Sequence, residues 1–327
     1  EEGQECEIVD GYVPKSKSAE PLVVKMDSSK NAAFLGSTLL NSAVRTVPWE
    51  SLNIRMDKPI GEGAFGATYP GKLAGLPVAV KVLKAEVVSD ELLLAFKKEV
   101  KVLAAVTHPN LLQMIAVVPD RLGIVTEMQS HGDLDKFLER ERQNLQQALR
   151  FSVVRDVAQG MAWLAYCGFI HRDLKLQNIL IGQGHQARVG DFGLCSLATD
   201  VQDSCGTIAY MAPETLEVDG KPTEKSDVYA YSIVLLATFS NTDVDFQAVV
   251  DGMQGTQGTL KMLKRLLDEG AVAPFIEAVK AGKRPAVPSE VPDKIKELVL
   301  KCWAHDAAER PAFAGVVDMI IDLSPSS

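Results

Sequence analysis

The sequence predicts an α+β fold in which a small antiparallel sheet with one helix precedes a larger, mainly helical region. From Trp49 onward, short runs rich in β-branched residues are broken by glycines, as in IGEGAFGATYPGKL and GLPVAVKVL. Such runs are typical of strands joined by turns. After Gly132 the apolar residues recur at helical spacing instead. The β-rich part therefore comes first and the helical part second.

Three helices are expected at particular places. Ser89 or Asp90 can cap a helix that runs to about Ala104. Its apolar residues repeat at spacings of 4, 4 and 3, namely Leu92, Phe96, Val100 and Leu103. Two further buried helices are expected at 226–239 and 293–303, in the C-terminal half of the chain.

Composition and charge exclude several classes of protein. The 327 residues are 46% hydrophobic and 24% charged, and the formal net charge is -9. A negative balance argues against nucleic acid as the main partner. No apolar run approaches the roughly 20 residues of a membrane helix, so no membrane span is expected. The odd number of widely spaced cysteines favours reduced thiols and a cytoplasmic location; they are Cys6, Cys167, Cys195, Cys205 and Cys302.

Two segments stand apart from this organisation. Residues 1–46 are rich in Ser, Lys and small residues without an apolar period. They are expected to form a flexible arm, either a simple solvated linker or a segment that a regulatory domain or partner contacts. An insertion at about 243–270 carries an apolar stripe of Leu260, Leu263, Leu266 and Leu267.

The first motif is a glycine pattern. Gly61, Gly63 and Gly66 form G-x-G-x-x-G between two strand-like runs, where backbone N–H groups can approach phosphate oxygens. Taken alone, the pattern is also consistent with an ordinary glycine-rich turn that binds no phosphate. A dinucleotide site would need a helix directly after the third glycine. Here 67–69 continue as strand, which argues against that alternative.

A charged pair follows the glycines. Lys81 ends the apolar run VAVK, and Glu99 comes 18 residues later on the expected helix. A helix carboxylate can hold a strand ammonium in place beside phosphates. The plainer alternatives are a solvated strand lysine and an ordinary exposed helix glutamate.

The most specific motif is HRDLKLQN at 171–178. A carboxylate at Asp173 can orient an attacking hydroxyl and accept its proton, and Asn178 can turn an amide oxygen toward a metal. DFG at 191–193 and GTIAYMAPE at 206–214 follow. In this order the motifs resemble those of eukaryotic protein kinases, and the resemblance covers Trp49 to about Leu323.

The resemblance implies a two-lobed kinase fold, with the N-lobe and hinge at 47–130 and the C-lobe at 131–324, including an activation segment at 191–214. It implies ATP and Mg²⁺ as cofactors and a protein substrate. The implied catalytic residues are Asp173, Lys175 and Asn178, and the implied metal ligands are Asn178 and Asp191. The implied nucleotide-binding residues are Ile60, Gly61, Gly63, Gly66, Thr68, Ala79, Lys81, Glu99, Thr126, Glu127, Gln129, Asp133, Leu180 and Asp191. For Asp133, a helix N-cap is an equally simple role.

The resemblance also bears on the acceptor. Lys175 and Thr207 are typical of serine/threonine kinases, which is the expected activity. Trp49-Glu50, KCW and RPAF favour the tyrosine-kinase-like group, near the Raf, mixed-lineage and plant receptor-like kinases. The alternatives are a catalytically weak or inactive pseudokinase scaffold, and a dual-specificity or tyrosine kinase.

The family pattern predicts two further features. Glu214 pairs with Arg310, and Asp227 anchors the catalytic loop from a buried helix. Regulation is expected at a hydroxyl of the activation segment, where a phosphate would order the segment through Arg172. The candidate hydroxyls are Ser196, Thr199 and Ser204.

Overall fold

The computed structural model describes residues 44–63, 66–83, 90–200, 206–246, 249 and 272–323. These residues pack as two compact units. The first contains residues up to Leu94 together with Met114–Met128, and the second contains Ala95–Gln113 and the chain from Gln129 onward. The first is built on an antiparallel sheet and the second mainly on helices, which confirms the predicted α+β class.

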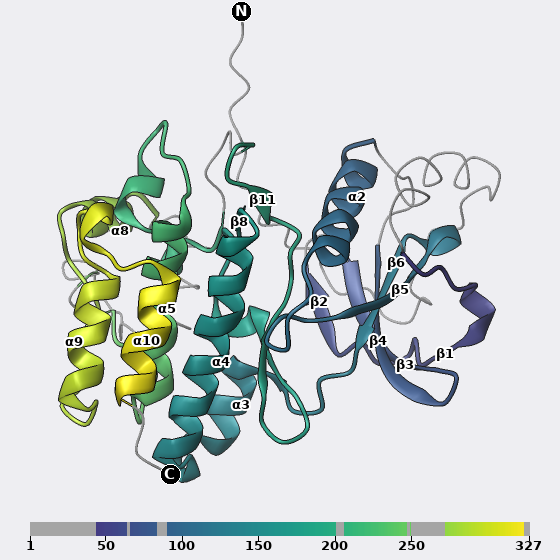
Figure 1. Cartoon of the computed structure of the whole chain (residues 1–327), viewed down its shortest axis with the longest axis horizontal. Helices are drawn as coiled ribbons and strands as arrows, with labels where there is room; N and C mark the ends of the chain where they lie inside the picture. The colour runs from purple at the N-terminus through teal and green to yellow at the C-terminus, as the bar shows by residue number, and fades with distance from the viewer. Residues whose placement is uncertain are drawn as a thin grey trace, which may run out of the picture. The chain divides into compact units, whose positions relative to one another are not determined.

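The first unit is a six-stranded antiparallel sheet with the order β1-β3-β4-β6-β5, in which β2 pairs with β3 (Figure 1). Its strands are β1 (Leu52–Ile54), β2 (Gly61–Gly63), β3 (Gly66–Leu73), β4 (Leu76–Leu83), β5 (Met114–Val118) and β6 (Gly123–Glu127). Ala74 and Gly75 connect β3 to β4 with φ values of 49° and 85°. This two-residue turn with positive φ matches the right-handed twist of the strands it joins.

The alternation of side chains along the strands distinguishes the valine core face of the sheet from the opposite face. Val78, Val80 and Val82 of β4 belong to a buried cluster with Tyr69 and Val125. Because successive side chains of a strand point to opposite faces, the residues between them lie on the other face. These are Ala79 and Lys81, two of the residues predicted to bind nucleotide.

The chain joins this sheet before Trp49. Thr46 forms a parallel bridge with Val117, and the Val47 N–H donates to the Val117 carbonyl at 3.0 Å. The predicted arm at 1–46 thus meets the edge strand β5 at its last residues, and residues 1–43 lie outside the described part of the chain.

The helix predicted after the first strands is α2 (Asp90–Ala105), which confirms that expectation. Phe96, Val100 and Leu103 of its apolar stripe are buried. Helix α2 begins in the first unit and ends in the second.

In the second unit α4 packs against α10 and α5, and α5 packs against α9 (Figure 1). The helices predicted at 226–239 and 293–303 are α5 and α9, and both predictions are confirmed. Besides the end of α2, the helices in the described part of this unit are α3 (Leu134–Glu141), α4 (Gln147–Tyr166), α5 (Glu224–Phe239), α8 (Val272–Lys280), α9 (Asp293–Cys302) and α10 (Phe313–Leu323).

In the described part of the second unit, five short strands bring distant segments together. They are β7 (Gly132–Asp133), β8 (Phe169–Ile170), β9 (Ile179–Ile181), β10 (Ala187–Val189) and β11 (Ser196–Leu197). Strand β8 pairs with β11 and β9 pairs with β10, both antiparallel. The HRDLKLQN segment lies between β8 and β9, and DFG lies between β10 and β11. The two pairings therefore place these motifs side by side.

Helix α5 is apolar on all sides and is buried along nearly its whole length. Thr223 and Ser226 close its first turn with a capping box. Its last carbonyls accept hydrogen bonds from two buried guanidinium groups: Arg142 donates to Ala237, and Arg150 donates to Thr238. These cations satisfy the C-terminal carbonyls and complement the helix dipole. Both ends of α5 are thus held, which fixes Asp227 in its first turn.

Several sequence predictions fall on residues that can be described only in part. The insertion at 243–270 is described at 243–246 and 249, where Asp245 bridges Ala286 in antiparallel fashion. Its predicted leucine stripe lies outside the described residues. Cys167, Cys195 and Cys302 are free thiols. Among the described helices, none is long and apolar enough to cross a membrane.

Candidate active site

Asp227 organises the backbone of the HRD segment. It is 4% exposed, and its two carboxylate oxygens accept from the N–H groups of His171 at 2.7 Å and Arg172 at 2.9 Å. Burial raises the pKa of Asp227, and the hydrogen bonds from these two N–H groups oppose that rise. Arg172 has a φ of 71°, a left-handed conformation that costs energy for a residue other than glycine. The two bonds from Asp227 hold this strained turn in place.

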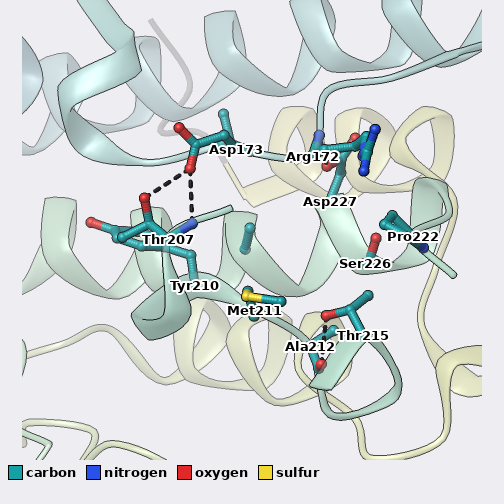
Figure 2. A pocket seen from close by; sticks show the side chains of 12 residues that line it. Arg172, Asp173, Thr207, Tyr210, Met211, Ala212, Thr215, Pro222, Ser226 and Asp227 are labelled. Atoms are coloured by element: carbon teal, nitrogen blue, oxygen red, sulfur yellow. Dashed lines mark hydrogen bonds between the residues drawn. The ribbon is translucent and has the colours of Figure 1, made fainter. Parts of the chain in front are cut away.

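The Asp173 carboxylate is held by four donors. Its Oδ1 accepts from the Thr207 N–H at 3.0 Å and from Thr207 Oγ1 at 2.8 Å, and Figure 2 shows these two bonds. Its Oδ2 lies 2.7 Å from Lys175 Nζ and accepts from Asn178 Nδ2 at 3.0 Å. With both oxygens engaged, the carboxylate has one orientation.

Thr207 joins the catalytic segment to the GTIAYMAPE segment. Lys175 Nζ donates to Thr207 Oγ1 at 2.8 Å, so Lys175, Asp173 and Thr207 form a closed triangle. A cavity of about 20 Å³ lies behind it, between Asp227 and Met211. That volume holds about one water molecule, so the cavity is a packing space and no substrate pocket. Sequence reasoning placed Thr207 beside Lys175 but did not identify it as a direct partner of Asp173.

The two predicted metal ligands lie on adjacent segments. The Gly190 N–H donates to the Asn178 carbonyl at 2.8 Å, and Asp191 follows with an exposed side chain and a φ of 58°. A Cβ added at Gly193 would lie 3.5 Å from Asp191 Oδ1 and 3.9 Å from Glu99 Oε2. The structure therefore gathers Glu99 and the DFG segment in one place.

These oxygens can supply only part of a metal's coordination sphere. In the described part of the chain, no group of three or more His, Cys, Asp or Glu side chains could hold a metal by itself. Carboxylate and amide oxygens suit Mg²⁺, which commonly keeps water and substrate phosphate oxygens as its remaining ligands. Asn178 and Asp191 fit that type of site.

In the first unit, several predicted nucleotide-binding residues form a continuous row. Gly61 pairs with Thr68, and Thr68 pairs with Lys81, across β2, β3 and β4. Ala79 of β4 pairs with Thr126 of β6. Residues directly opposite one another on paired strands share a face. Thr68, Ala79, Lys81 and Thr126 therefore lie on the face opposite the valine core.

The other predicted contacts of this unit border that row. The Ile60 N–H donates to the Thr68 carbonyl at 2.8 Å, and the Ile60 side chain is exposed. Gly63 pairs with Gly66, and a Cβ at Gly66 would clash with the Val82 carbonyl. Glu127, the last residue of β6, pairs with Val78.

Three predicted nucleotide contacts meet in the second unit. Asp133 of β7 pairs with Leu180 of β9. Asp133 is also the N-cap of α3, where its Oδ1 accepts from the Lys136 N–H at 2.9 Å. Gln129 is 8% exposed, and its Oε1 accepts from Arg188 at 3.1 Å. The contacts expected to join the two units, including Lys81 with Glu99, stay predictions.

Arg310 is almost completely buried, at 1% exposure. It binds Glu214 through two hydrogen bonds of 2.6 and 2.8 Å, as the sequence predicted. Its guanidinium also lies 5.2 Å from the ring centre of Tyr229, and that of Arg284 lies 5.1 Å from it. The sequence did not point to Arg284, which comes from a loop more than 50 residues after Tyr229.

Comparison with known proteins decides the family. A family model described as protein tyrosine and serine/threonine kinase matches residues 54–320. The chain belongs to the protein kinase family. This membership confirms the two-lobed kinase fold that the sequence predicted.

Curated relatives of this kinase chain come from plants and amoebae. It is 31% identical over 289 residues to the serine/threonine-protein kinase STY17 of Arabidopsis thaliana, covering 85% of this chain and 46% of that protein. It is 31% identical over 278 residues to the dual specificity protein kinase shkC of Dictyostelium discoideum, covering 82% and 51%. It is 31% identical over 293 residues to the serine/threonine-protein kinase CTR1 of Arabidopsis thaliana, covering 86% of this chain and 32% of that protein. The kinase chain thus spans about half or less of these relatives.

The kinase activation segment is described on both sides of residues 201–205. Ser196 lies in β11 at 2% exposure, and Arg172 Nη1 is 3.5 Å from its hydroxyl oxygen. Thr199 is exposed and donates to Asp200 at 2.9 Å. Modification of Ser196 would require the β8–β11 pair to open, whereas Thr199 is accessible. Ser204 lies outside the described residues, and phosphorylation of any of the three stays a prediction.

We expect Gly206→Ala to lower kcat of this kinase about tenfold to a hundredfold. Gly206 has a φ of 134°, and a Cβ there would lie 2.5 Å from the Arg172 carbonyl oxygen. The clash would move Thr207 away from Asp173, and small displacements at a reacting centre have effects of this size. Steady-state transfer to a serine peptide measures kcat. Gly282→Ala is the control, because Gly282 has a φ of 86° but open space around it. An unchanged kcat in Gly206→Ala would refute this role.

Proposed function

We propose that this chain transfers the γ-phosphoryl group of ATP to serine and threonine hydroxyls of protein substrates. The observation that carries the proposal is the Asp173 carboxylate, held by Thr207, Lys175 and Asn178 in a single orientation. The relatives STY17 and CTR1 are both named serine/threonine-protein kinases, which supports serine and threonine as the acceptors.

The proposed chemistry assigns one task to each residue of the catalytic segment. Asp173 orients the acceptor hydroxyl and takes its proton as the oxygen bonds to the γ-phosphorus. The bond between that phosphorus and the bridging oxygen breaks, and ADP leaves with the electron pair. Lys175, whose ammonium lies between Asp173 and Thr207, stabilises charge on the transferred phosphoryl group.

Asn178 and Asp191 are proposed to hold Mg²⁺, which neutralises phosphate charge when bound. The exposed side chain of Asp191 and the backbone bond that ties its segment to Asn178 support this assignment. Lys81, positioned by Glu99, is proposed to bind phosphate oxygens. The glycine loop at 61–66 is proposed to cover the phosphates with backbone N–H groups.

The remaining predicted contacts form the proposed adenosine site. Thr68 and Ala79 lie on the face of the first sheet opposite the valine core, and Thr126 on the same face is the proposed gatekeeper. Glu127 and Gln129 would offer backbone hydrogen bonds to adenine. Ile60 and Leu180 would contact the base, and Asp133 would contact the ribose.

Location and regulation complete the proposal. A cytoplasmic location is supported by the three described cysteines, which are free thiols. A regulatory domain or partner is proposed to contact the N-terminal arm, whose last residues already pair with β5.

We expect Thr207→Val to lower kcat about tenfold with little change in folding. Valine keeps the shape of threonine but removes the hydroxyl that bonds to both Asp173 and Lys175. The Thr207 N–H still donates to Asp173, so the carboxylate loses only part of its support. Preorganised hydrogen bonds of this kind contribute about ten- to a thousandfold to catalysis. Thr107→Val is the matched control, because Thr107 is exposed and none of the proposed roles involves it. Equal rates in both variants would contradict the role given to Thr207.

The acceptor type is tested with γ-labelled ATP, Mg²⁺ and degenerate peptides that carry serine, threonine or tyrosine at one fixed position. The proposal predicts label on serine and threonine peptides. Label on tyrosine as well would instead support the dual-specificity alternative, for which the name of shkC is the supporting observation. Transfer to tyrosine alone would refute the proposed acceptor.

A further inference from the structure

A second cavity, of about 450 Å³, opens on the helical unit beside α3 and the start of α4. We call it the α3–α4 pocket. Its size falls in the range of ligand sites in proteins. It is lined by residues of α3, of the segment that leads into α4, and of the loops before β7 and between β9 and β10. None of the predicted catalytic or nucleotide-binding residues lines it.

One wall of this pocket is aromatic. The rings of His131 and His185 stack with their centres 4.8 Å apart and an interplanar angle of 21°. Phe137 lies 5.9 Å from His131 and 5.7 Å from His185. His185 has a φ of 65°, and such strained residues cluster at ligand sites. The wall is further fixed by Arg140, which donates to the His131 carbonyl at 2.7 Å.

The rest of the lining is apolar at one place and negative at another. Leu145 and Leu149 are half-buried, and the exposed Glu141 is the one carboxylate among the lining residues. Among the described residues, no group of three or more potential ligands could hold a metal. Both imidazoles line the pocket, and because their inner faces contact each other, a ligand meets the outer side of the stacked pair. A flat cation with an apolar neighbour matches this combination.

We propose that the α3–α4 pocket binds an arginine side chain in an extended segment of a partner protein. The guanidinium stacks on the His131–His185 wall and forms an ion pair with Glu141, since arginine is planar, stacks on aromatic rings and matches carboxylates. An apolar residue beside the arginine packs on Leu145 and Leu149. The net charge of -9 favours the approach of a basic segment. Such binding requires no phosphoryl transfer, so it can be measured separately from catalysis.

The test uses the whole chain and two fluorescein-labelled peptides without an acceptor hydroxyl, Gly-Ala-Leu-Arg-Leu-Ala-Gly and the same peptide with citrulline in place of arginine. Citrulline keeps the shape of arginine but has no charge. Fluorescence anisotropy is expected to show arginine-peptide binding about fivefold tighter than citrulline-peptide binding. Glu141→Gln should remove most of that difference, because an exposed ion pair contributes up to about fivefold in affinity. His131→Ala should weaken both peptides, because each loses its stacking surface.

Glu139→Gln is the matched control, since Glu139 is an exposed carboxylate of the same helix that does not line the pocket. It should leave both affinities unchanged. Equal affinity for the two peptides, no saturable binding of either, or tighter binding of a peptide with glutamate in place of arginine would overturn the proposal. An unchanged preference of Glu141→Gln for the arginine peptide would also overturn the proposal. Because Glu141 is exposed, this variant is expected to fold normally.

Discussion

Asp173→Asn is expected to lower kcat for peptide phosphorylation about a hundredfold to ten-thousandfold. The amide keeps the size of the carboxylate, so the contacts with Thr207 and Lys175 are partly retained. It cannot accept the proton of the acceptor hydroxyl, and general-base catalysis contributes a factor of this order. The measurement is kcat with a serine peptide, together with the Kd of ATP. Nucleotide affinity should stay within about twofold, because Asp173 is not among the proposed nucleotide contacts.

Asp318→Asn is the matched control for this variant. Asp318 lies on α10 with an exposed side chain, and none of the proposed roles involves it. Its kcat should equal that of the unchanged chain. If Asp173→Asn retained a third or more of the original kcat, Asp173 would not be the base.

The second large effect concerns stability. Arg310→Ala is expected to lower the free energy of unfolding by about 3 kcal/mol, because it leaves several carbonyls without their donor and leaves Glu214, whose side chain is 30% exposed, without its cation. Arg310 is 1% exposed and binds Glu214 with two hydrogen bonds. It also donates to the carbonyls of Ala304, Lys225 and His305, which would lose their partner. Urea titration followed by fluorescence measures the change.

Two other arginine variants separate the contributions of charge and geometry. Arg310→Lys keeps the charge but loses the two parallel hydrogen bonds to Glu214. Its free energy of unfolding should therefore lie between those of the unchanged chain and Arg310→Ala. Arg55→Ala removes an exposed arginine of the sheet unit and should shift stability by no more than about 0.5 kcal/mol. Equal stability of Arg310→Ala and Arg55→Ala would show that the buried pair contributes nothing.

The parts of the site that sequence reasoning found are those with short, fixed spacing. Asp173 and Asn178 are five residues apart, and their hydrogen bond follows from that local turn. The helix α2 was predictable because its apolar residues repeat with a helical period. Asp227 and Arg310 were found through the family pattern, because the residue type alone does not tell whether a charged side chain is buried or exposed.

The parts that were missed depend on contacts between distant residues. Thr207 bonds to Asp173 across 34 positions of the sequence. No period or spacing encodes such a contact. The guanidinium groups of Arg142 and Arg150 cap α5 from about 90 residues away or more, and sequence alone suggests surface charges there. The stacked His131 and His185 meet only because β7 pairs with β9, which the chain reaches 46 residues later.

The most direct test of the central claim compares the unchanged chain with Asp191→Asn in one experiment. Both proteins, at equal concentration, receive γ-labelled ATP, Mg²⁺ and a serine peptide, and the initial rate of label transfer is measured. The variant loses a proposed Mg²⁺ ligand, and preorganised charge terms of this kind contribute about a hundredfold or more. The account predicts measurable transfer by the unchanged chain and at least a hundredfold less by Asp191→Asn. Equal transfer by the two proteins, or none by the unchanged chain, would contradict it.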